Sequence, residues 1–158
     1  MTKLSFRYAE ENDCEKILYF IKELASYEKM SEDVVATETL LHEWLFEKKK
    51  AEVIFACENE KEVGFALFFH NFSTFLGRAG IYLEDIYVLP EFRGKGYGKA
   101  LLKQLASIAN ERGCGRLEWM CLNWNKPSID FYLSLGAKPM DDWTVYRLTG
   151  DSLKALAK

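Results

Sequence analysis

The sequence predicts an α+β fold in which a mixed, mostly antiparallel sheet carries helices on both faces. Three observations predict it. Short apolar segments mark strands, and two of them, 53–57 and 63–72, are joined by a polar turn as in a hairpin. Apolar residues at helical spacing mark helices before and between the strands. A glycine-rich stretch separates one strand from one helix. Runs of antiparallel strands with interposed helices indicate an α+β sheet.

The N-terminal segments begin with a strand over 4–8, where Leu, Phe and Tyr alternate with polar residues. Asn12 is the expected N-cap of the first helix, and Glu15 would complete a capping box. Apolar residues at helical spacing over 17–24 give that helix a core-facing side. These features predict a strand that leads directly into a helix.

A second, shorter helix is expected after Thr37 and ends at the lysines 48–50, whose charge suits a helix C-terminus. Its inner face is predicted to carry Leu41, Trp44 and Leu45. The hairpin follows, with its turn at 59–62, and the next strand is expected over 79–88.

The second half of the chain continues with an amphipathic helix that begins near Lys99 and is capped by Gly113. A strand over 117–122 and a helix that starts at Pro127 come next. A last strand over 144–148 and a short helix over 151–158 complete the prediction. No repeat, low-complexity tract or linker interrupts the pattern, so residues 1–158 are expected to form a single domain.

Composition limits the possible functions. The 158 residues are 49% hydrophobic and 15% aromatic, which is typical of one globular domain with a substantial core. A net charge of −3 argues against nucleic acid as the main partner. The longest apolar run, 63–69, is too short to cross a membrane, and no signal peptide is recognisable. Four cysteines without a C-x-x-C pair predict no metal and a reducing cytoplasm.

The strand and loop over 83–99 read L-E-D-I-Y-V-L-P-E-F-R-G-K-G-Y-G-K and predict an anion site. Alternate glycines allow the backbone to approach a ligand closely, and the helix that follows offers unpaired N–H groups. Neither of the common nucleotide motifs fits. A Walker A loop would need four residues between its glycines and a hydroxyl residue after the lysine, and G-x-G-x-x-G fails from Gly94 and from Gly96.

The remaining pattern, R-x-x-G-x-G after a strand, resembles the acetyl-CoA loop of the GNAT (Gcn5-related) N-acetyltransferases. Together with W-N-K-P-S-I-D-F-Y over 124–132 and E-L-A-S-Y-E over 23–28, it is similar to the diamine and spermidine/spermine N-acetyltransferases and their thialysine-acetylating relatives. The resemblance covers nearly the whole chain. It implies the GNAT fold, in which the sheet is splayed at the acetyl-CoA site, and a homodimer.

The chemistry of acetyl transfer requires two proton transfers. An alkyl ammonium has a pKa of about 10.4, so a base must accept its proton, and the departing thiolate benefits from an acid. Glu84 and Asp85 lie just before the loop, and only one of them should face the cleft unless the strand contains a bulge. From the residues alone, Glu84 could also be an exposed strand carboxylate, and Tyr132 a core aromatic.

The resemblance assigns roles by position. It implies that Glu84 is a water-assisted base that also binds substrate, and that Tyr132 is the acid near the CoA sulfur. Tyr27, Glu28 and Asp142 are expected to bind a small cationic amine, with Asp141 as the next candidate. The residues expected to hold acetyl-CoA are Ile86, Tyr87, Val88, Arg93, Gly94, Lys95, Gly96, Tyr97, Gly98, Lys99, Asn125, Ser128 and Tyr132.

Three departures from the group are visible. The hairpin turn is shorter than in animal members, Lys126 stands where those members often carry an acid, and the late substrate-contacting acid does not align cleanly. The cation at Lys126 and the unaligned late acid leave a shorter diamine or a lysine-like amino acid open beside a long polyamine. Two further alternatives are a GNAT acting on a peptide N-terminus or an aminoglycoside, and a non-catalytic acyl-CoA-binding module.

Overall fold

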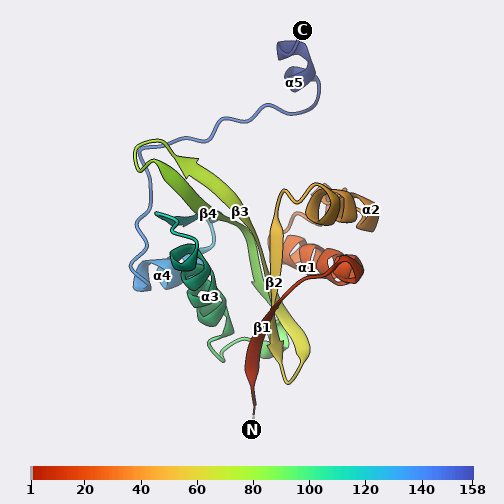
Figure 1. Cartoon of the computed structure of the whole chain (residues 1–158), viewed down its shortest axis with the longest axis vertical. Helices are drawn as coiled ribbons and strands as arrows, with labels where there is room; N and C mark the ends of the chain where they lie inside the picture. Colours follow the sequence, from red (N-terminus) through yellow and green to blue (C-terminus); the bar gives the residue numbers. More distant parts are fainter. Residues whose placement is uncertain (1) are drawn as a thin grey trace. The chain divides into compact units, whose positions relative to one another are not determined.

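A computed structural model describes residues 2–158 of the chain (Figure 1). The chain divides into two compact units, residues 1–120 and residues 121–158, and each is described by itself. The first unit contains the whole sheet and the glycine loop. The second unit contains the W-N-K-P-S-I-D-F-Y segment and the C-terminal residues.

The sheet has five strands in the order β1-β2-β3-β4-β5. Its strands are β1 Leu4–Tyr8, β2 Glu52–Glu58, β3 Lys61–Ser73, β4 Arg78–Val88 and β5 Leu117–Trp119. The first four are antiparallel neighbours, whereas β5 pairs with β4 in parallel. The predicted mixed, mostly antiparallel sheet of an α+β protein is confirmed.

Helices cover both faces of this sheet (Figure 1). On one side lie α1 Cys14–Tyr27, α2 Glu38–Leu41 and the π-helical turn η3 His42–Glu47. On the other side lies α3 Tyr97–Glu111. Three short 3-10 turns complete the unit: η1 Glu11–Asp13, η2 Ser31–Asp33 and η4 Pro90–Phe92.

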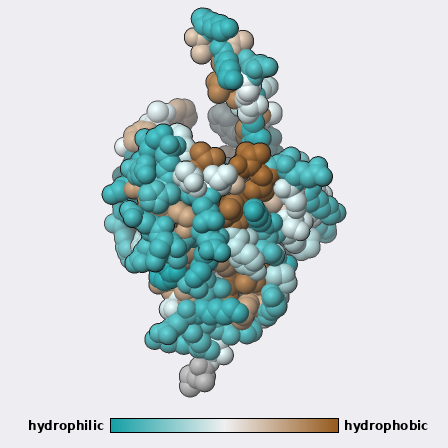
Figure 2. All heavy atoms as spheres, turned by 90° about the vertical axis from the view of Figure 1, so that its right-hand side faces the viewer, coloured by the Kyte–Doolittle hydropathy of each residue, from teal (hydrophilic) through white to brown (hydrophobic). Residues whose placement is uncertain are grey.

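The core beneath α1 is built from the inward face of the helix and the alternate residues of three strands. Phe20 stacks on Phe65 with ring centroids 5.3 Å apart and also contacts Phe55. The buried members of this cluster are Ile17, Phe20, Leu24, Leu45, Val53, Phe55, Cys57, Phe65, Tyr87 and Leu89. The outer surface on the side of α1 and α2 is mainly hydrophilic, with some hydrophobic atoms exposed among the hydrophilic ones (Figure 2).

The turn between β2 and β3 is tighter than the predicted four residues. Only Asn59 and Glu60 separate the strands, and both have positive φ angles, 50° and 73°. Two left-handed residues in a two-residue hairpin match the right-handed twist of the flanking strands. The predicted hairpin is thus confirmed, with longer strands.

The start of α1 differs from the prediction. Asn12 is not the N-cap, because a 3-10 turn precedes the helix, and the Glu10 N–H donates to the Asp13 carboxylate at 2.7 Å. Arg7 in β1 holds the same carboxylate at 2.8 Å and also reaches Glu62 at 2.6 Å. Asp13 is buried, and its hydrogen bond with Arg7 holds its pKa below the ordinary value. The capping box is therefore formed by Glu10 and Asp13, three residues apart, and not by Asn12 and Glu15.

The second helix begins as predicted, since the Thr37 side chain accepts a hydrogen bond from the Leu40 N–H at 3.1 Å. It then widens into the π-helical turn, which rotates the residues that follow. Leu45 is buried, whereas the Trp44 side chain is 46% exposed and lies under the Lys48 ammonium, 4.0 Å from the ring centroid. The predicted inner face is therefore wrong at Trp44.

The second unit contains α4 Lys126–Ser134 and α5 Gly150–Leu156. The strand predicted over 144–148 is not formed: no described residue pairs with it, and the Tyr146 side chain is 92% exposed. An alternating pattern needs a neighbouring strand to become part of a sheet, and this unit provides none. The strand predicted over 117–122 is likewise shorter, because its pairing with β4 ends at Trp119. No helix within 2–158 is both long and apolar enough to cross a membrane.

Candidate active site

The glycine loop lies between the end of β4 and the start of α3. Gly94 and Gly96 have φ angles of 78° and 82°, a left-handed conformation that favours glycine. A Cβ atom added at Gly94, Gly96 or Gly98 would meet nothing within 4 Å, so the surface above the loop is open. The first N–H groups of α3 have no partners within the helix and carry its partial positive charge. The loop is therefore shaped to receive an anion.

A carboxylate on the neighbouring strand holds this loop in place. The Tyr97 hydroxyl donates to Glu58 at 2.5 Å, and the Lys95 ammonium lies 3.1 Å from the same carboxylate. These two contacts, the tyrosine hydrogen bond first, keep the pKa of Glu58 below its ordinary value. The ring of Tyr97 is buried, so this residue anchors the loop to the protein interior. Glu58 was not among the residues predicted from the sequence, because the hairpin pattern gives no sign of its partners in the loop.

Arg93, the first cation of the loop, contacts other parts of the protein through its side chain. Arg93 Nε donates to the Val88 carbonyl at 2.9 Å. Its guanidinium carbon lies 5.1 Å from the centroid of the Tyr27 ring and 5.0 Å from that of Tyr87. Lys99 is exposed. The structure thus brings the predicted cofactor residue Arg93 together with the predicted substrate residue Tyr27.

The edge of β4 beyond Leu83 carries the predicted backbone contacts to acetyl-CoA. Parallel pairing joins Ile81, Tyr82 and Leu83 of β4 to residues 117–119 of β5 and stops there. Residues 86–88 pair only with β3 on the opposite side. Within the part of the chain that the structure describes, the second edge of these residues pairs with no strand. The pairing of β4 with β5 thus ends before residues 86–88, and the splay of the sheet at an acetyl-CoA site stays a prediction.

A bulge in β4 places the predicted base. Val88 pairs with Gly64, and a Cβ at Gly64 would contact both Val88 and Leu101 of α3, so Val88 faces α3. Phe68 lies four residues after Gly64 on β3, on the same face, and Leu83 is its partner. Leu83 and Val88 are five residues apart yet face the same side, which a regular strand does not allow. Glu84 is the extra residue.

The bulge sets two consecutive acids opposite one residue. The register steps from Phe68 paired with Leu83 to Leu67 paired with Asp85. Asp85, two residues before Tyr87, faces α1. Glu84 is exposed. Bulges re-aim side chains in this way and are frequent beside active sites.

Three carboxyl groups influence one another at this position. Burial first, and then the charges of Glu84 and Glu28, raise the pKa of Asp85 from 3.8 to about 7. Burial and the charge of Glu84 also raise the pKa of Glu28, the residue that follows α1. The cluster of Glu28, Glu84 and Asp85, called the acidic cluster below, therefore favours the arrival of a cation or a proton.

Asp85 is the functional candidate that the sequence reasoning did not assign. Its signal was the pair Glu84-Asp85 directly before the loop, together with the stated exception for a bulge. Strand alternation alone would place the two side chains on opposite faces. The extra residue in the register, which no sequence pattern marks, is what makes both of them available to one site.

The second unit holds the remaining predicted residues. The Asn125 side chain caps α4 by accepting a hydrogen bond from the Ser128 N–H at 3.4 Å. Tyr132, one helical turn after Ser128, is half-buried, and its ring lies 5.7 Å from that of Phe131. Asp141 and Asp142 are exposed in a separate turn beyond the end of α4. The structure therefore places Asn125, Ser128 and Tyr132 on one helix.

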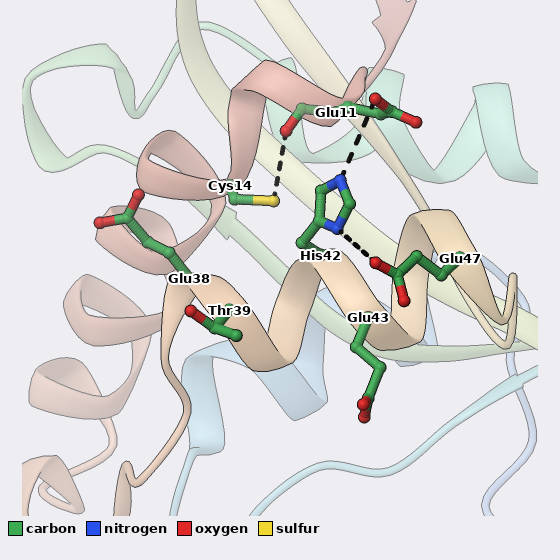
Figure 3. Close-up of a pocket in the computed structure, with 7 residues that line it drawn as sticks. All are labelled: Glu11, Cys14, Glu38, Thr39, His42, Glu43 and Glu47. Carbon is green, nitrogen blue, oxygen red and sulfur yellow. Dashed lines mark hydrogen bonds and ion pairs between the residues drawn. The ribbon is translucent and has the colours of Figure 1, made fainter.

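A separate pocket lies between the start of α1 and the helix pair α2–η3 (Figure 3). His42 lies between two acids there: Nδ1 is 3.2 Å from Glu47 and Nε2 is 4.0 Å from Glu11. The Cys14 thiol donates to the Glu11 carbonyl at 3.4 Å. No three His, Cys, Asp or Glu side chains within residues 2–158 are arranged to hold a metal ion. The pair formed by His42 and Glu11 joins η3 to η1.

Comparison with protein families gives one match over most of the chain. The model of the acetyltransferase (GNAT) family matches residues 17–137. These residues include α1, the sheet from β2 onward, the glycine loop and α4. The match therefore covers every predicted site residue except the two late acids.

Individual relatives agree with that match. The chain is 38% identical to a thialysine N-epsilon-acetyltransferase of Bos taurus over 99% of both proteins. It is 45% identical over 95 residues to an L-ornithine N5-acetyltransferase of Arabidopsis thaliana, which covers 60% of this chain and 42% of that protein. Among solved structures, an integron cassette protein from the mobile metagenome of V. cholerae superposes with a TM-score of 0.82 at 31% identity, over 98% of both chains.

Proposed function

We propose that this chain, which belongs to the acetyltransferase (GNAT) family, moves an acetyl group from acetyl-CoA to a primary amine of a small cationic substrate. Members of this family are enzymes that transfer acetyl groups. The single observation that carries the choice of substrate is the acidic cluster, which lies on the strand before the glycine loop and at the end of α1. A compact cation suits three neighbouring carboxyl groups.

The residues present fit acetyl-CoA as the acetyl donor. The open glycines and the helix N-terminus suit a pyrophosphate, and Glu58 holds the loop in this shape. The unpaired edge of β4 over 86–88 offers backbone groups to an extended pantetheine arm. In this assignment Asn125 and Ser128 contact the same molecule from α4.

The amine must lose a proton before it attacks. At pH 7 only roughly one alkyl amine in 2,500 is neutral, given a pKa of about 10.4. Glu84 accepts the ammonium proton through a water molecule, while Glu28 and Asp85 hold the cation nearby. The neutral amine then forms a bond to the acetyl carbon, the carbon–sulfur bond breaks, and the nitrogen loses its second proton as the amide forms. Tyr132 donates its proton to the departing thiolate and regains one from that nitrogen, directly or through solvent. No group on the enzyme carries the acetyl.

We favour a short diamine or a lysine-like amino acid over a long polyamine. Two relatives are named as acetyltransferases of thialysine and of ornithine, which are both diamino acids. Lys126, the cation that departs from the animal members, is paired with Asp130 at 3.0 Å, so its charge is partly neutralised within α4. The other proposed substrate contacts are Tyr27 and Asp142, and Asp141 is the alternative to Asp142. A single catalytic domain, a homodimer and a cytoplasmic location complete the proposal.

The test is thiol release from acetyl-CoA with a panel of amines. The panel contains ornithine, lysine, thialysine, a C4 diamine, spermidine, a peptide with a free N-terminus and an aminoglycoside. The proposal expects the highest kcat/KM with a diamine or diamino acid. Peptide or aminoglycoside as the preferred substrate would contradict it. CoA binding without release of thiol from any amine would instead favour a non-catalytic module.

A further inference from the structure

Arg93 lies at the border between the glycine loop and the α1 terminus, and its side chain contacts protein groups from two further segments. Its Nε bonds the Val88 carbonyl, which ends β4, and its guanidinium covers the rings of Tyr27 and Tyr87. The two rings lie 6.2 Å apart. One side chain therefore joins the loop, the end of β4 and the end of α1.

Each of these partners adjoins the acidic cluster. Tyr27 is the last residue of α1, and Glu28 follows it directly. Tyr87 is buried two residues after Asp85, on the same face of β4. Burial raises the pKa of the Tyr87 hydroxyl, and the adjacent Arg93 charge opposes that rise. Arg93 thus supports the two elements that carry the acidic cluster.

The backbone of Arg93 belongs to the anion loop itself. It caps the turn η4 and precedes Gly94, the first left-handed residue. Ordering of this loop by a bound pyrophosphate fixes the point from which the Arg93 side chain extends. That side chain in turn restricts the position of the Tyr27 ring, and thereby of Glu28. A planar guanidinium that stacks on two rings transmits position better than a flexible ammonium would.

We propose that Arg93 is a positioning residue that couples the two substrate sites, so that occupancy of the acetyl-CoA site strengthens binding of the amine through Tyr27, Tyr87 and the Val88 carbonyl. The inference rests on the proposed function. By linkage the coupling is reciprocal: the amine strengthens CoA binding by the same factor. Typical couplings between sites are about 5–150-fold, and for contacts at a partly exposed position we expect roughly tenfold.

Calorimetry with the whole protein tests the coupling without relying on turnover. The Kd of ornithine, or of the best amine from the panel, is measured with and without saturating CoA. Wild type should bind the amine roughly tenfold more tightly when CoA is present, within the range typical of coupled sites. Arg93→Ala should reduce this ratio to about 1–2, whatever its effect on the affinity for CoA alone, because the ratio measures the coupling between the two sites. Arg93→Lys should behave like Arg93→Ala, since the ammonium has neither the Nε–H nor the planar face.

Two controls separate coupling from charge and from general damage. Lys103→Ala removes an exposed cation from α3 and should keep the wild-type ratio. Tyr27→Leu should lower the ratio, and adding Arg93→Ala to it should cause little further loss. Unfolding transitions of all variants are recorded, and the conservative Arg93→Lys serves if Arg93→Ala does not fold.

The outcomes distinguish the two proposals. An unchanged ratio in both Arg93 variants would overturn the coupling and leave the proposed function intact. A loss of CoA affinity of tenfold or more with an unchanged ratio would make Arg93 a phosphate ligand and would also overturn it. Wild type that binds no amine of the panel, with or without CoA, would overturn the proposed function together with the inference.

Discussion

Asp85→Asn should stabilise the protein at pH 8 and change its stability much less near pH 4.5. Burial and the charges of Glu84 and Glu28 raise the pKa of Asp85 from 3.8 to about 7. The folded protein therefore holds this proton more tightly than the unfolded chain does. Stability from the neutral carboxyl is complete below about pH 4 and is lost as the pH rises to about 7. Asparagine is neutral at every pH and escapes this loss.

The magnitude follows from the shift. About three pKa units at 1.36 kcal/mol each give an upper limit of about 4 kcal/mol. Water enters partly exposed sites and neighbouring acids share the titration, so about 2 kcal/mol is the expected gain at pH 8. For a chain of this size that gain corresponds to a rise in Tm of roughly 4–8 °C.

The assay is unfolding by urea and by heat for wild type and Asp85→Asn between pH 4.5 and 8.5. Asp33→Asn, at an exposed carboxylate in η2, is the matched control and should change stability little at any pH. A difference between Asp85→Asn and wild type that stays constant over this range would refute the reasoning, because it would mean that Asp85 is already ionised at acidic pH. The activity of Asp85→Asn should fall, as expected if the destabilising charge of Asp85 contributes to the active site.

Three other changes test the site. Gly96→Val forces a β-branched residue to a φ of 82° and should weaken CoA binding at least about tenfold, whereas equal affinity by calorimetry in a folded variant would remove the loop from the cofactor site. Glu28→Gln should raise the KM for a diamine more than for a monoamine of similar length. The difference should correspond to about 1.5–3 kcal/mol of binding free energy, or less if water reaches the site, and equal rises would move the distal contact elsewhere. Tyr132→Phe keeps the ring and should lower kcat roughly 10²–10⁴-fold with little change in Tm, and activity within a few-fold of wild type would leave Tyr132 as a packing residue only.

The sequence predicted most of the first unit because its signals are local. Alternating residues gave the strands, and helical spacing from 17 to 24 and from Lys99 onward gave α1 and α3. The glycine loop was recognisable because residue type and conformation agree at Gly94 and Gly96, where both φ angles are positive. Such agreement between levels is what makes a segment predictable.

Two features that escaped prediction depend on distant partners. The bulge at Glu84 exists only in the register between β3 and β4, and the contact of Glu58 with the loop joins residues 39 positions apart. Two other misses are local: Glu10 and Asp13 form the capping box in place of Asn12 and Glu15, and the π-helical turn rotates Trp44 outward. The segment 144–148 alternates like a strand but pairs with no described strand. The roles of the individual site residues stay predictions.

The pH dependence of kcat/KM with a diamine or diamino acid tests the central claim most directly, using wild type and Glu84→Gln. Glutamine keeps the size and hydrogen bonding of Glu84 but cannot accept the ammonium proton. The variant must wait for amine that is already neutral in solution, roughly one molecule in 2,500 at pH 7 and about a third at pH 10. The ratio of wild type to variant should therefore be large near pH 7 and shrink toward pH 10. A ratio that stays constant across this range would contradict the account, because Glu84 would then hold the cation without helping to remove its proton.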